Sequence, residues 1–243
     1  MGQITVITSG KGGTGKSTCT IGLASAFCNF KEKVIIFDLD EGLRCLDLML
    51  GVSENLVFDL SDILNGEKTL DEVKLKVNDY IDLVAAPANI GGYDRQKFAD
   101  LVYNASNLYD RVIIDCPAGI DTEFYKNIPT FADVLIIEPL NNIGCRSAAT
   151  LENLLTECGV KHKYLIINKF NYNDLKHKMV LNIDQIIDKT GLMIKGIVPY
   201  DQNLDELSQK GRLYTSSTSF PAFCRIAKRL DNANVPLPEL KRI

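Results

Sequence analysis

A ten-residue stretch near the start of the chain, SGKGGTGKST, carries the side chains with the clearest capacity for chemistry. It satisfies the phosphate-binding pattern G-x-x-x-x-G-K-[S/T], which begins here at Gly10 and ends with Lys16 and Ser17. Its four glycines let the backbone turn tightly with N–H groups pointing inward, which makes a nest for an anion. Lys16 is expected to reach the β- and γ-phosphates of a nucleotide, and the Ser17 hydroxyl is expected to hold Mg²⁺. A glycine-rich hairpin turn is the alternative, but the loop lies between an apolar run and a helix-like segment, as a phosphate-binding loop does.

Acidic residues follow two further apolar runs. Asp38 and Asp40 close one of them, and Asp115 closes the other. Because a carboxylate at the end of a buried strand can reach a magnesium ion through water, Asp38 and Asp115 are candidate metal-site residues. Asp40 could also be a helix N-cap, an interpretation that its position alone leaves open.

The loop and these carboxylates need a scaffold that brings them together, and the pattern of the chain predicts one. Seven short runs rich in β-branched residues are typical of buried strands, at residues 3–10, 33–40, 80–87, 111–119, 133–140, 163–170 and 194–201. Helix-like segments lie between them at residues 16–31, 94–108, 143–158 and 179–190. This alternation predicts an α/β fold with three layers, in which a doubly wound, mostly parallel sheet gathers ligands at the carboxyl ends of its strands. We find no repeat, low-complexity tract or linker, so a single domain over residues 1–243 is expected.

The composition limits the classes of protein that remain. The 243 residues are 46% hydrophobic and 24% charged with a formal net charge of −4, so coating of nucleic acid by bulk charge is not favoured and sequence-specific nucleic-acid binding is not expected. No apolar run approaches the ~20 residues of a membrane-spanning helix. The seven cysteines show no C-x-x-C spacing, and the chain has two histidines, so a Cys/His metal site is not favoured. The odd number of cysteines and the lack of a signal peptide suggest reduced thiols in the cytoplasm.

The loop has one lysine more than a phosphate site requires. Lys11 lies five residues before Lys16, and the stretch KGGTGKST resembles the deviant Walker A motif of the MinD/ParA class of P-loop ATPases. The resemblance extends from Ile4 to about Leu230 and implies a P-loop NTPase fold. In that class the first lysine reaches across a nucleotide-sandwich dimer to the partner's phosphates, which makes dimerisation depend on the γ-phosphate. The resemblance therefore implies a homodimer formed with ATP, in which Lys11 and Lys16 are both catalytic; a solvated surface lysine is the alternative for Lys11.

The segment after the second apolar run, FDLDEGLRCLDLMLG, resembles switch I of the MinD branch, D-x-D-x-G-L-R-N-L-D. On this resemblance Asp40 is the catalytic residue that orients the attacking water, a role in which a carboxylate acts through hydrogen-bond geometry. Arg44 and Asp47 are expected to pair with each other. The chain departs from the pattern at Glu41 and Cys45, where Ile and Asn are usual.

The stretch RVIIDCPAGID resembles the Walker B strand followed by switch II, D-[S/T]-P-A-G-I-E. The resemblance supports Asp115 as a residue of the Mg²⁺ shell. Gly119 is expected to let a backbone N–H approach the γ-phosphate. Cys116 stands where the pattern has a hydroxyl residue, and we interpret it as a small residue at the edge of the core.

The stretch INKFN bears on which base the site reads. GTPases of the P-loop class read guanine with N-K-x-D, and here Asn171 stands in the place of the aspartate. An amide can donate to and accept from adenine, and VPYDQ resembles the turn that flanks adenine in the family, so ATP with Mg²⁺ is the expected ligand. The residues expected to contact the nucleotide are Gly10, Lys11, Gly12, Gly13, Thr14, Gly15, Lys16, Ser17, Thr18, Asn168, Pro199 and Asp201.

The C-terminal region bears on membrane binding, because MinD proteins of the division-site system end in a basic amphipathic helix that binds anionic membrane. An apolar stripe at i, i+3, i+4 and i+7 is present here at Phe223, Ile226, Ala227 and Leu230. Its alternative role is docking into the core of the domain. Pro236 and Pro238 stop any helix beyond it, and the remaining ELKRI is too short for an interfacial anchor. The expected location is the cytoplasm; a peripheral position at the inner face of the cell membrane stays open, although no clear C-terminal anchor is found.

The resemblance implies an ATP-dependent dimerising switch with slow ATP hydrolysis, which an activating protein partner stimulates and which places the cell-division site. Flagellar-number regulators and partitioning ATPases share the motifs, although switch I favours the MinD branch over the partitioning ATPases. A scaffold that binds nucleotide with little turnover is the alternative from a different class. Lys11, Lys16 and Asp40 favour the switch.

Overall fold

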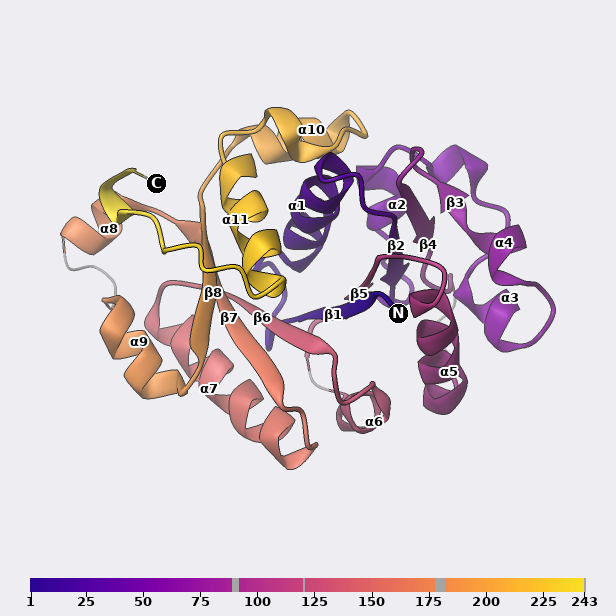
Figure 1. The fold of residues 1–243 in the computed structure, drawn as a ribbon, viewed down its shortest axis with the longest axis horizontal. Coiled ribbons are helices and arrows are strands. Elements are labelled where there is room, and N and C mark those ends of the chain that lie inside the picture. Colours follow the sequence, from indigo (N-terminus) through magenta and orange to yellow (C-terminus); the bar gives the residue numbers. More distant parts are fainter. Residues whose placement is uncertain (89–91, 120, 178–181, 243) are drawn as a thin grey trace.

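The computed structural model describes residues 1–88, 92–119, 121–177 and 182–242 (Figure 1). Seven strands form in the seven predicted runs: β1 (Gln3–Thr8), β2 (Val34–Asp38), β4 (Ile81–Val84), β5 (Arg111–Asp115), β6 (Asp133–Pro139), β7 (His162–Phe170) and β8 (Met193–Pro199). The four expected helices also form, as α1 (Lys16–Asn29), α5 (Arg95–Ser106), α7 (Asn142–Glu157) and α9 (Ile183–Thr190). Residues 179–181, which the sequence assigns to the last of these helices, lie outside the described residues.

Short elements were missed by the sequence analysis. They are the edge strand β3 (Leu75–Lys76), the helices α2 (Leu46–Met49), α3 (Leu60–Leu64), α4 (Leu70–Val73), α6 (Thr122–Asn127), α8 (Tyr172–Lys176) and α10 (Asn203–Gln209), and the 3₁₀ turns η1 (Ser53–Asn55), η2 (Tyr214–Ser216) and η3 (Leu240–Arg242). Each is shorter than two full turns or three strand residues, so none presents a sustained period of apolar residues. A last helix, α11 (Phe220–Leu230), contains the predicted apolar stripe.

The eight strands form one sheet in the order β3-β4-β2-β5-β1-β6-β7-β8, and every neighbouring pair is parallel except β3 with β4. The predicted doubly wound sheet is confirmed. The central strand β1 lies between β5 and β6, so the chain after β1 first builds one half of the sheet and then crosses over to build the other. In such sheets ligands bind where the strand order reverses, and here that point is the carboxyl end of β1.

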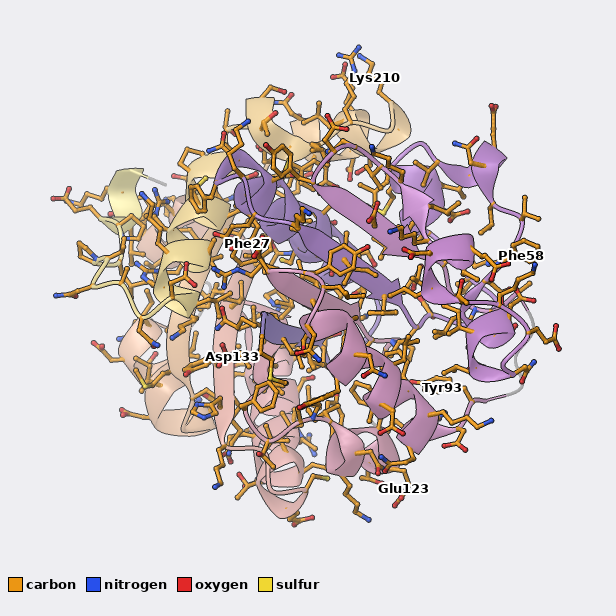
Figure 2. The ribbon with its side chains drawn as sticks, turned by 45° about the vertical axis from the view of Figure 1, so that its right-hand side comes forward. Phe27, Phe58, Tyr93, Glu123, Asp133 and Lys210 are labelled. Atoms are coloured by element: carbon orange, nitrogen blue, oxygen red, sulfur yellow. The ribbon has the colours of Figure 1, made fainter. Side chains whose placement is uncertain are left out.

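Helices cover both faces of this sheet, which gives the expected three layers (Figure 1). One face packs against α1 and α11, and the other packs against α5, α7 and α9. Strand β2 contributes to both cores because its side chains alternate: Val34 and Ile36 face the first layer, whereas Ile35 and Phe37 face the second. Figure 2 shows the ring of Phe27 inside the molecule, while the side chain of Lys210 projects from its surface.

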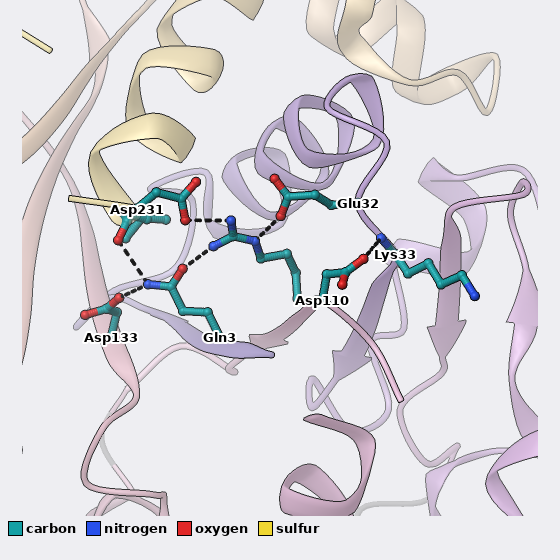
Figure 3. Close-up of polar contacts among 8 residues, drawn as sticks. Gln3, Glu32, Lys33, Asp110, Asp133 and Asp231 are labelled. Atoms are coloured by element: carbon teal, nitrogen blue, oxygen red, sulfur yellow. Dashed lines mark hydrogen bonds and ion pairs between the residues drawn. The ribbon is translucent and has the colours of Figure 1, made fainter. Parts of the chain in front are cut away.

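A network of polar side chains lies at the amino ends of the central strands, opposite the carboxyl ends (Figure 3). The guanidinium of Arg111, at the start of β5, pairs with the carboxylates of Glu32 and Asp231 and donates to the side-chain oxygen of Gln3. The Gln3 amide in turn donates to Asp133 Oδ2 at 2.5 Å. Because these residues come from the ends of several elements, the network links α1 and α11 to the central strands. Its place far from the phosphate-binding loop suits a stabilising role.

The apolar stripe of α11 docks into the core, as the alternative to a membrane-facing helix predicts. Phe223, Ile226, Ala227 and Leu230 are each at most 2% exposed. The segment after α11 then runs across β8 (Figure 1). Arg229 holds it there, since its guanidinium donates to the backbone oxygens of Val235, Pro236 and Lys195 at 2.6 to 2.8 Å. Among the described residues no helix is long and apolar enough to cross a membrane.

Candidate nucleotide site

The glycine-rich loop connects β1 to α1 at the point where the strand order reverses. Gly13 and Gly15 adopt left-handed backbone conformations, with φ of 77° and 94°, that other residues rarely take. Gly15 is also the N-cap of α1, so the first N–H groups of this helix receive no side-chain cap. The first turn contains no acidic residue. The start of α1 therefore offers uncapped N–H groups and a positive dipole end to an anion.

Two residues at the end of β7 donate hydrogen bonds to backbone oxygens of the glycine-rich loop. Asn168, which is buried, donates from Nδ2 to the backbone oxygen of Thr14 at 2.8 Å, and Lys169 donates from Nζ to the oxygen of Gly13 at 2.8 Å. A Cβ on Gly15 would lie 2.2 Å from Asn168 Nδ2, so this contact requires a glycine there. The amide of Asn168, expected near the base, thus contacts the loop backbone in this structure.

The predicted metal-site carboxylates lie side by side on adjacent strands. Asp38 ends β2 and Asp115 ends β5, and the two are register partners that are 1% and 2% exposed. Burial, and then the repulsion between the two carboxylates, raises the pKa of Asp115 to about 7. Burial likewise raises the pKa of Asp38 to about 6. Two buried carboxylates placed together in this way favour a cation between or beside them.

The residues present fit a magnesium ion. Asp115 Oδ1 is fully buried and has no hydrogen-bond partner among the described residues. The Ser17 hydroxyl lies 3.5 Å from the thiol of Cys45, a weak donor that leaves the oxygen available as a ligand. Across the described residues no group of three or more His, Cys, Asp or Glu side chains forms a ready-made metal cage. Carboxylate and hydroxyl oxygens suit Mg²⁺, which prefers oxygen ligands and is usually held by a few protein groups together with water and substrate phosphates.

Asp40 lies beside the same site on the segment after β2. Its backbone N–H donates to Asp38 Oδ1 at 3.0 Å, which ties its position to that of the Asp38 carboxylate. Partial burial raises the pKa of Asp40, and the positive charge of Lys16 opposes that rise. Asp40 also lines a cavity of 290 Å³ together with Gly119, whose φ is 106° and whose N–H donates to the oxygen of Ser9 at 3.2 Å. The cavity lies between the segments that resemble the two switches.

The two lysines of the loop differ in their surroundings. Lys16 is 9% exposed, and its positive charge opposes the rise in the pKa of both Asp115 and Asp40. Lys11 is exposed and lines a hollow of 520 Å³ between the loop and the first turns of α7, where Ile143 and Arg146 are also exposed. Among the described residues Lys11 forms no ion pair with an acidic side chain.

The turn that resembles the adenine-flanking motif follows β8. Pro199 ends this strand as the register partner of Phe170. Asp201 is occupied by its own loop, because its carboxylate accepts from the backbone N–H of Asn203, from the hydroxyl of Thr218 and from the backbone N–H of Ser219. In this structure Asp201 therefore shapes the turn and anchors it near the start of α11.

The expected pairing of Arg44 with Asp47 is wrong. Arg44 instead pairs with Asp59 at 2.9 Å and donates to the backbone oxygen of Ala86 at 2.7 Å, which ties the switch I segment to the neighbouring strand β4 and helix α3. Asp47 is buried, and its Oδ1 has no hydrogen-bond partner among the described residues. The partner of Arg44 comes from an unpredicted helix cap, which local spacing could not reveal.

Two residues that contact the loop were missed. Lys169 follows Asn168 in the stretch INKFN, and its contact with the oxygen of Gly13 depends on how β7 lies beside the loop, which the sequence pattern does not show. Glu138, at the end of β6, accepts from the backbone N–H of Gly10 at 3.2 Å. The sequence contained no signal for this contact except the position of a carboxylate at the end of an apolar run.

A phosphate-binding loop that leads from a central parallel strand into a helix, with carboxylates on the adjacent strands, defines a P-loop NTPase. Residues 5–214 match the CobQ/CobB/MinD/ParA nucleotide binding domain family, and the chain belongs to this family. It is an ATPase related to the MinD proteins.

Relatives of known name cover almost the whole chain. The septum site-determining protein MinD of Synechocystis sp. is 31% identical over 97% of this chain and 92% of its own length. MinD of Bacillus subtilis is 30% identical over 99% of this chain and 93% of its own. Among solved structures, the MinC:MinD cell division protein complex of Aquifex aeolicus contains a chain with a TM-score of 0.88 and 28% identity, covering 98% of this chain and 99% of that one. MinD of Pyrococcus horikoshii, complexed with Mg-ADP, shares the fold with a TM-score of 0.81 at 22% identity over 97% of this chain and 100% of that one.

Proposed function

We propose that this chain is an ATP-dependent dimerising switch with slow hydrolysis, which acts in the placement of the cell-division site as the names of its relatives suggest. The division of labour between its two loop lysines carries the proposal. Lys16 is buried beside the carboxylates and can serve the nucleotide of its own chain, whereas Lys11 is exposed at the mouth of the loop. A cation that its own site does not need is available to the phosphates of a second copy.

Within each copy, the residues of the site divide the work of ATP binding. The loop N–H groups and the start of α1 bind the phosphates, and Lys16 adds a positive charge at the β- and γ-phosphates. Ser17, Asp38 and Asp115 would hold Mg²⁺, which when bound neutralises charge on the phosphate oxygens. Asp40 positions the attacking water by hydrogen bonding. Adenine would lie near Asn168, Pro199 and Asp201.

A similar solved structure supports a protein partner for this chain. The Aquifex neighbour is a MinD chain in complex with MinC, which supports a protein partner for this chain, and we propose that such a partner also stimulates hydrolysis. One sheet with helices on both faces accounts for the described residues, which supports a single ATPase domain over residues 1–243. We propose a cytoplasmic location with reversible association at the inner membrane face through partners or weak lipid contacts.

Single-turnover phosphate release tests the hydrolytic switch against a nucleotide-binding scaffold. Asp40→Ala should bind ATP with an affinity within about threefold of wild type and release phosphate ~100-fold more slowly, because only the positioning of water is lost. Lys16→Ala should instead lose most of its affinity for ATP, which makes it the control for a damaged phosphate site. Equal rates of phosphate release in wild type and Asp40→Ala would show that Asp40 is not catalytic, and negligible release by wild type would favour the scaffold.

A further inference from the structure

The carboxylate of Glu138 lies at the start of the phosphate-binding loop, although no motif places it there. Glu138 is the penultimate residue of β6, and β6 pairs with β1 in a register that sets Ile136 opposite Thr8. Two residues further along, Glu138 therefore lies beside Gly10, where the loop leaves the sheet. Its side chain is buried, with the residue only 3% exposed. A buried carboxylate next to a site for anionic phosphates is costly, so its position calls for a specific role.

Two donors converge on one oxygen of this carboxylate. Oε1 accepts from the backbone N–H of Gly10 at 3.2 Å and from the hydroxyl of Ser147, on α7, at 2.6 Å. A Cβ on Gly10 would lie 2.3 Å from Ser147 Oγ. Glycine at this position therefore leaves room for the Ser147 hydroxyl to lie beside the backbone of Gly10 while both donate to Glu138. The N–H of Gly10 is thus directed at Glu138.

These contacts fix the backbone on both sides of Lys11. On the preceding side, Gly10 is held by Glu138. The backbone oxygen of Lys11 itself accepts from the hydroxyl of Ser9 at 2.7 Å. With its backbone held, the side chain of Lys11 is exposed on the rim of the hollow that it shares with α7. Fixing the point of attachment of a long, flexible ammonium side chain lowers the entropy that is lost when it binds a partner.

We propose that Glu138 is a positioning residue, which acts through Gly10 to present Lys11 to the phosphates of a second copy of the chain. The inference rests on the proposed ATP-dependent dimer. It assigns to Glu138 an effect on the association of two ATP-bound chains and little effect on binding of nucleotide by one chain, because its hydrogen bonds reach Gly10 and Ser147 and not the N–H groups at the start of α1. The hydrogen bond that it accepts, and not its negative charge, carries this role.

Glu138→Met and Glu138→Gln separate the hydrogen bond from the charge at nearly constant side-chain volume. Methionine cannot accept well from the Gly10 N–H, whereas the glutamine oxygen can, and both remove the charge. The dimer dissociation constant with ATP should rise ~10-fold in Glu138→Met and stay within about twofold of wild type in Glu138→Gln. The affinity of the monomer for ADP should stay within about twofold of wild type in both variants. Analytical ultracentrifugation and calorimetric titration with ADP give the two readouts.

The outcomes distinguish this inference from the function on which it rests. If wild type stays monomeric with ATP, the proposed function fails first. If wild type dimerises and Glu138→Met dimerises equally well, or if Glu138→Gln is as defective as Glu138→Met, the positioning role of Glu138 is overturned. A parallel loss of ADP affinity in Glu138→Met would also overturn it, because general damage to the loop would then explain the result. If Glu138→Met does not fold, Glu138→Ala replaces it with the same expectations, and failure of both to fold while Glu138→Gln folds would show a purely structural role.

Discussion

At the scale of single residues, the site combines groups that are unfavourable in an isolated protein. Asp38 and Asp115 are buried side by side, and an oxygen of Asp115 has no partner among the described residues. Such groups oppose folding when they are charged and unliganded, and they become favourable when a cation and phosphates fill the site. The two carboxylates therefore lower the folding stability of the unliganded protein, and ligand binding offsets this loss.

This cost predicts a pH dependence for the nucleotide-free protein without Mg²⁺. Because burial raises the folded-state pKa of Asp115 from 3.8 to about 7, the folded state binds more protons than the unfolded state between these values. The contribution of Asp115 to stability therefore falls as pH rises from about 4 to 7, and the full penalty is present above 7. Asp115→Asn, which has no charge to bury, should be more stable than wild type at pH 8, and this advantage should shrink towards pH 5.

Urea denaturation at a series of pH values measures this difference. Comparing the two proteins at each pH cancels the contribution of groups that titrate equally in both. The Asn107→Asp variant, on an exposed helix C-cap, serves as a control for adding or removing a carboxylate away from the site. A constant difference between wild type and Asp115→Asn from pH 5 to pH 8 would contradict the raised pKa of Asp115.

At the scale of secondary structure, the position of the phosphate-binding loop depends on how closely α1 packs against α11. A Cβ added to Gly22, in the middle of α1, would lie 2.4 Å from atoms of the Phe223 ring on α11. The two helices therefore approach one another at a position where only glycine fits. Since α1 begins at the phosphate-binding loop, this contact also fixes the helix whose N-terminus faces the phosphates.

Gly22→Ala should destabilise the protein by overpacking, at a cost of ~1–3 kcal/mol even though alanine favours helix formation. For a chain of this size, such a cost lowers the melting temperature by roughly 2–4 °C per kcal/mol. Phe223→Leu in the same chain makes room for the added methyl, so the double variant should lose less stability than the two single changes added together. Additive losses, or a melting temperature unchanged by Gly22→Ala, would contradict the close contact of α1 with α11.

The sequence predicted the elements that have a long, regular pattern and missed those that depend on contacts across the chain. The parallel strands and the long helices follow from apolar periodicity, and the loop from its glycines. The contact of Arg44 with Asp59 could not be predicted, because the cap of α3 that supplies Asp59 is far from Arg44 in sequence. Glu138 was missed for a similar reason, since its role depends on the register of β6 with β1.

At the scale of the whole molecule, the segment after α11 is bound to the domain that precedes it. Arg229 donates to two of its backbone oxygens, and Leu240 packs against the core on the second face of the sheet. An apolar side chain cannot be buried in the core and in lipid at the same time. Binding of this segment to a membrane would therefore require it to be released first.

We predict that the ATP-bound protein pellets weakly with anionic liposomes. Leu240 contributes at most ~1.5–3 kcal/mol of apolar burial in lipid, which its release from the domain offsets. Two copies in a dimer and the basic side chain of Lys241 could increase binding through avidity and charge. Sedimentation of the full chain and of a variant lacking residues 239–243 measures the effect. Strong ATP-dependent pelleting that disappears on this deletion would contradict the prediction.

Light scattering of the purified protein tests the central claim, that an exposed lysine makes dimerisation depend on ATP. Wild type should have the mass of a dimer with ATP and Mg²⁺ and the mass of a monomer with ADP. Lys11→Ala should bind nucleotide but remain a monomer, because a symmetric dimer loses two charge-assisted contacts and weakens by ~100-fold or more. Lys161→Ala, which removes an exposed lysine just before β7 and away from the loop, is the control for loss of a positive charge and should still dimerise with ATP. Equal dimer populations for wild type and Lys11→Ala in the presence of ATP would contradict the account.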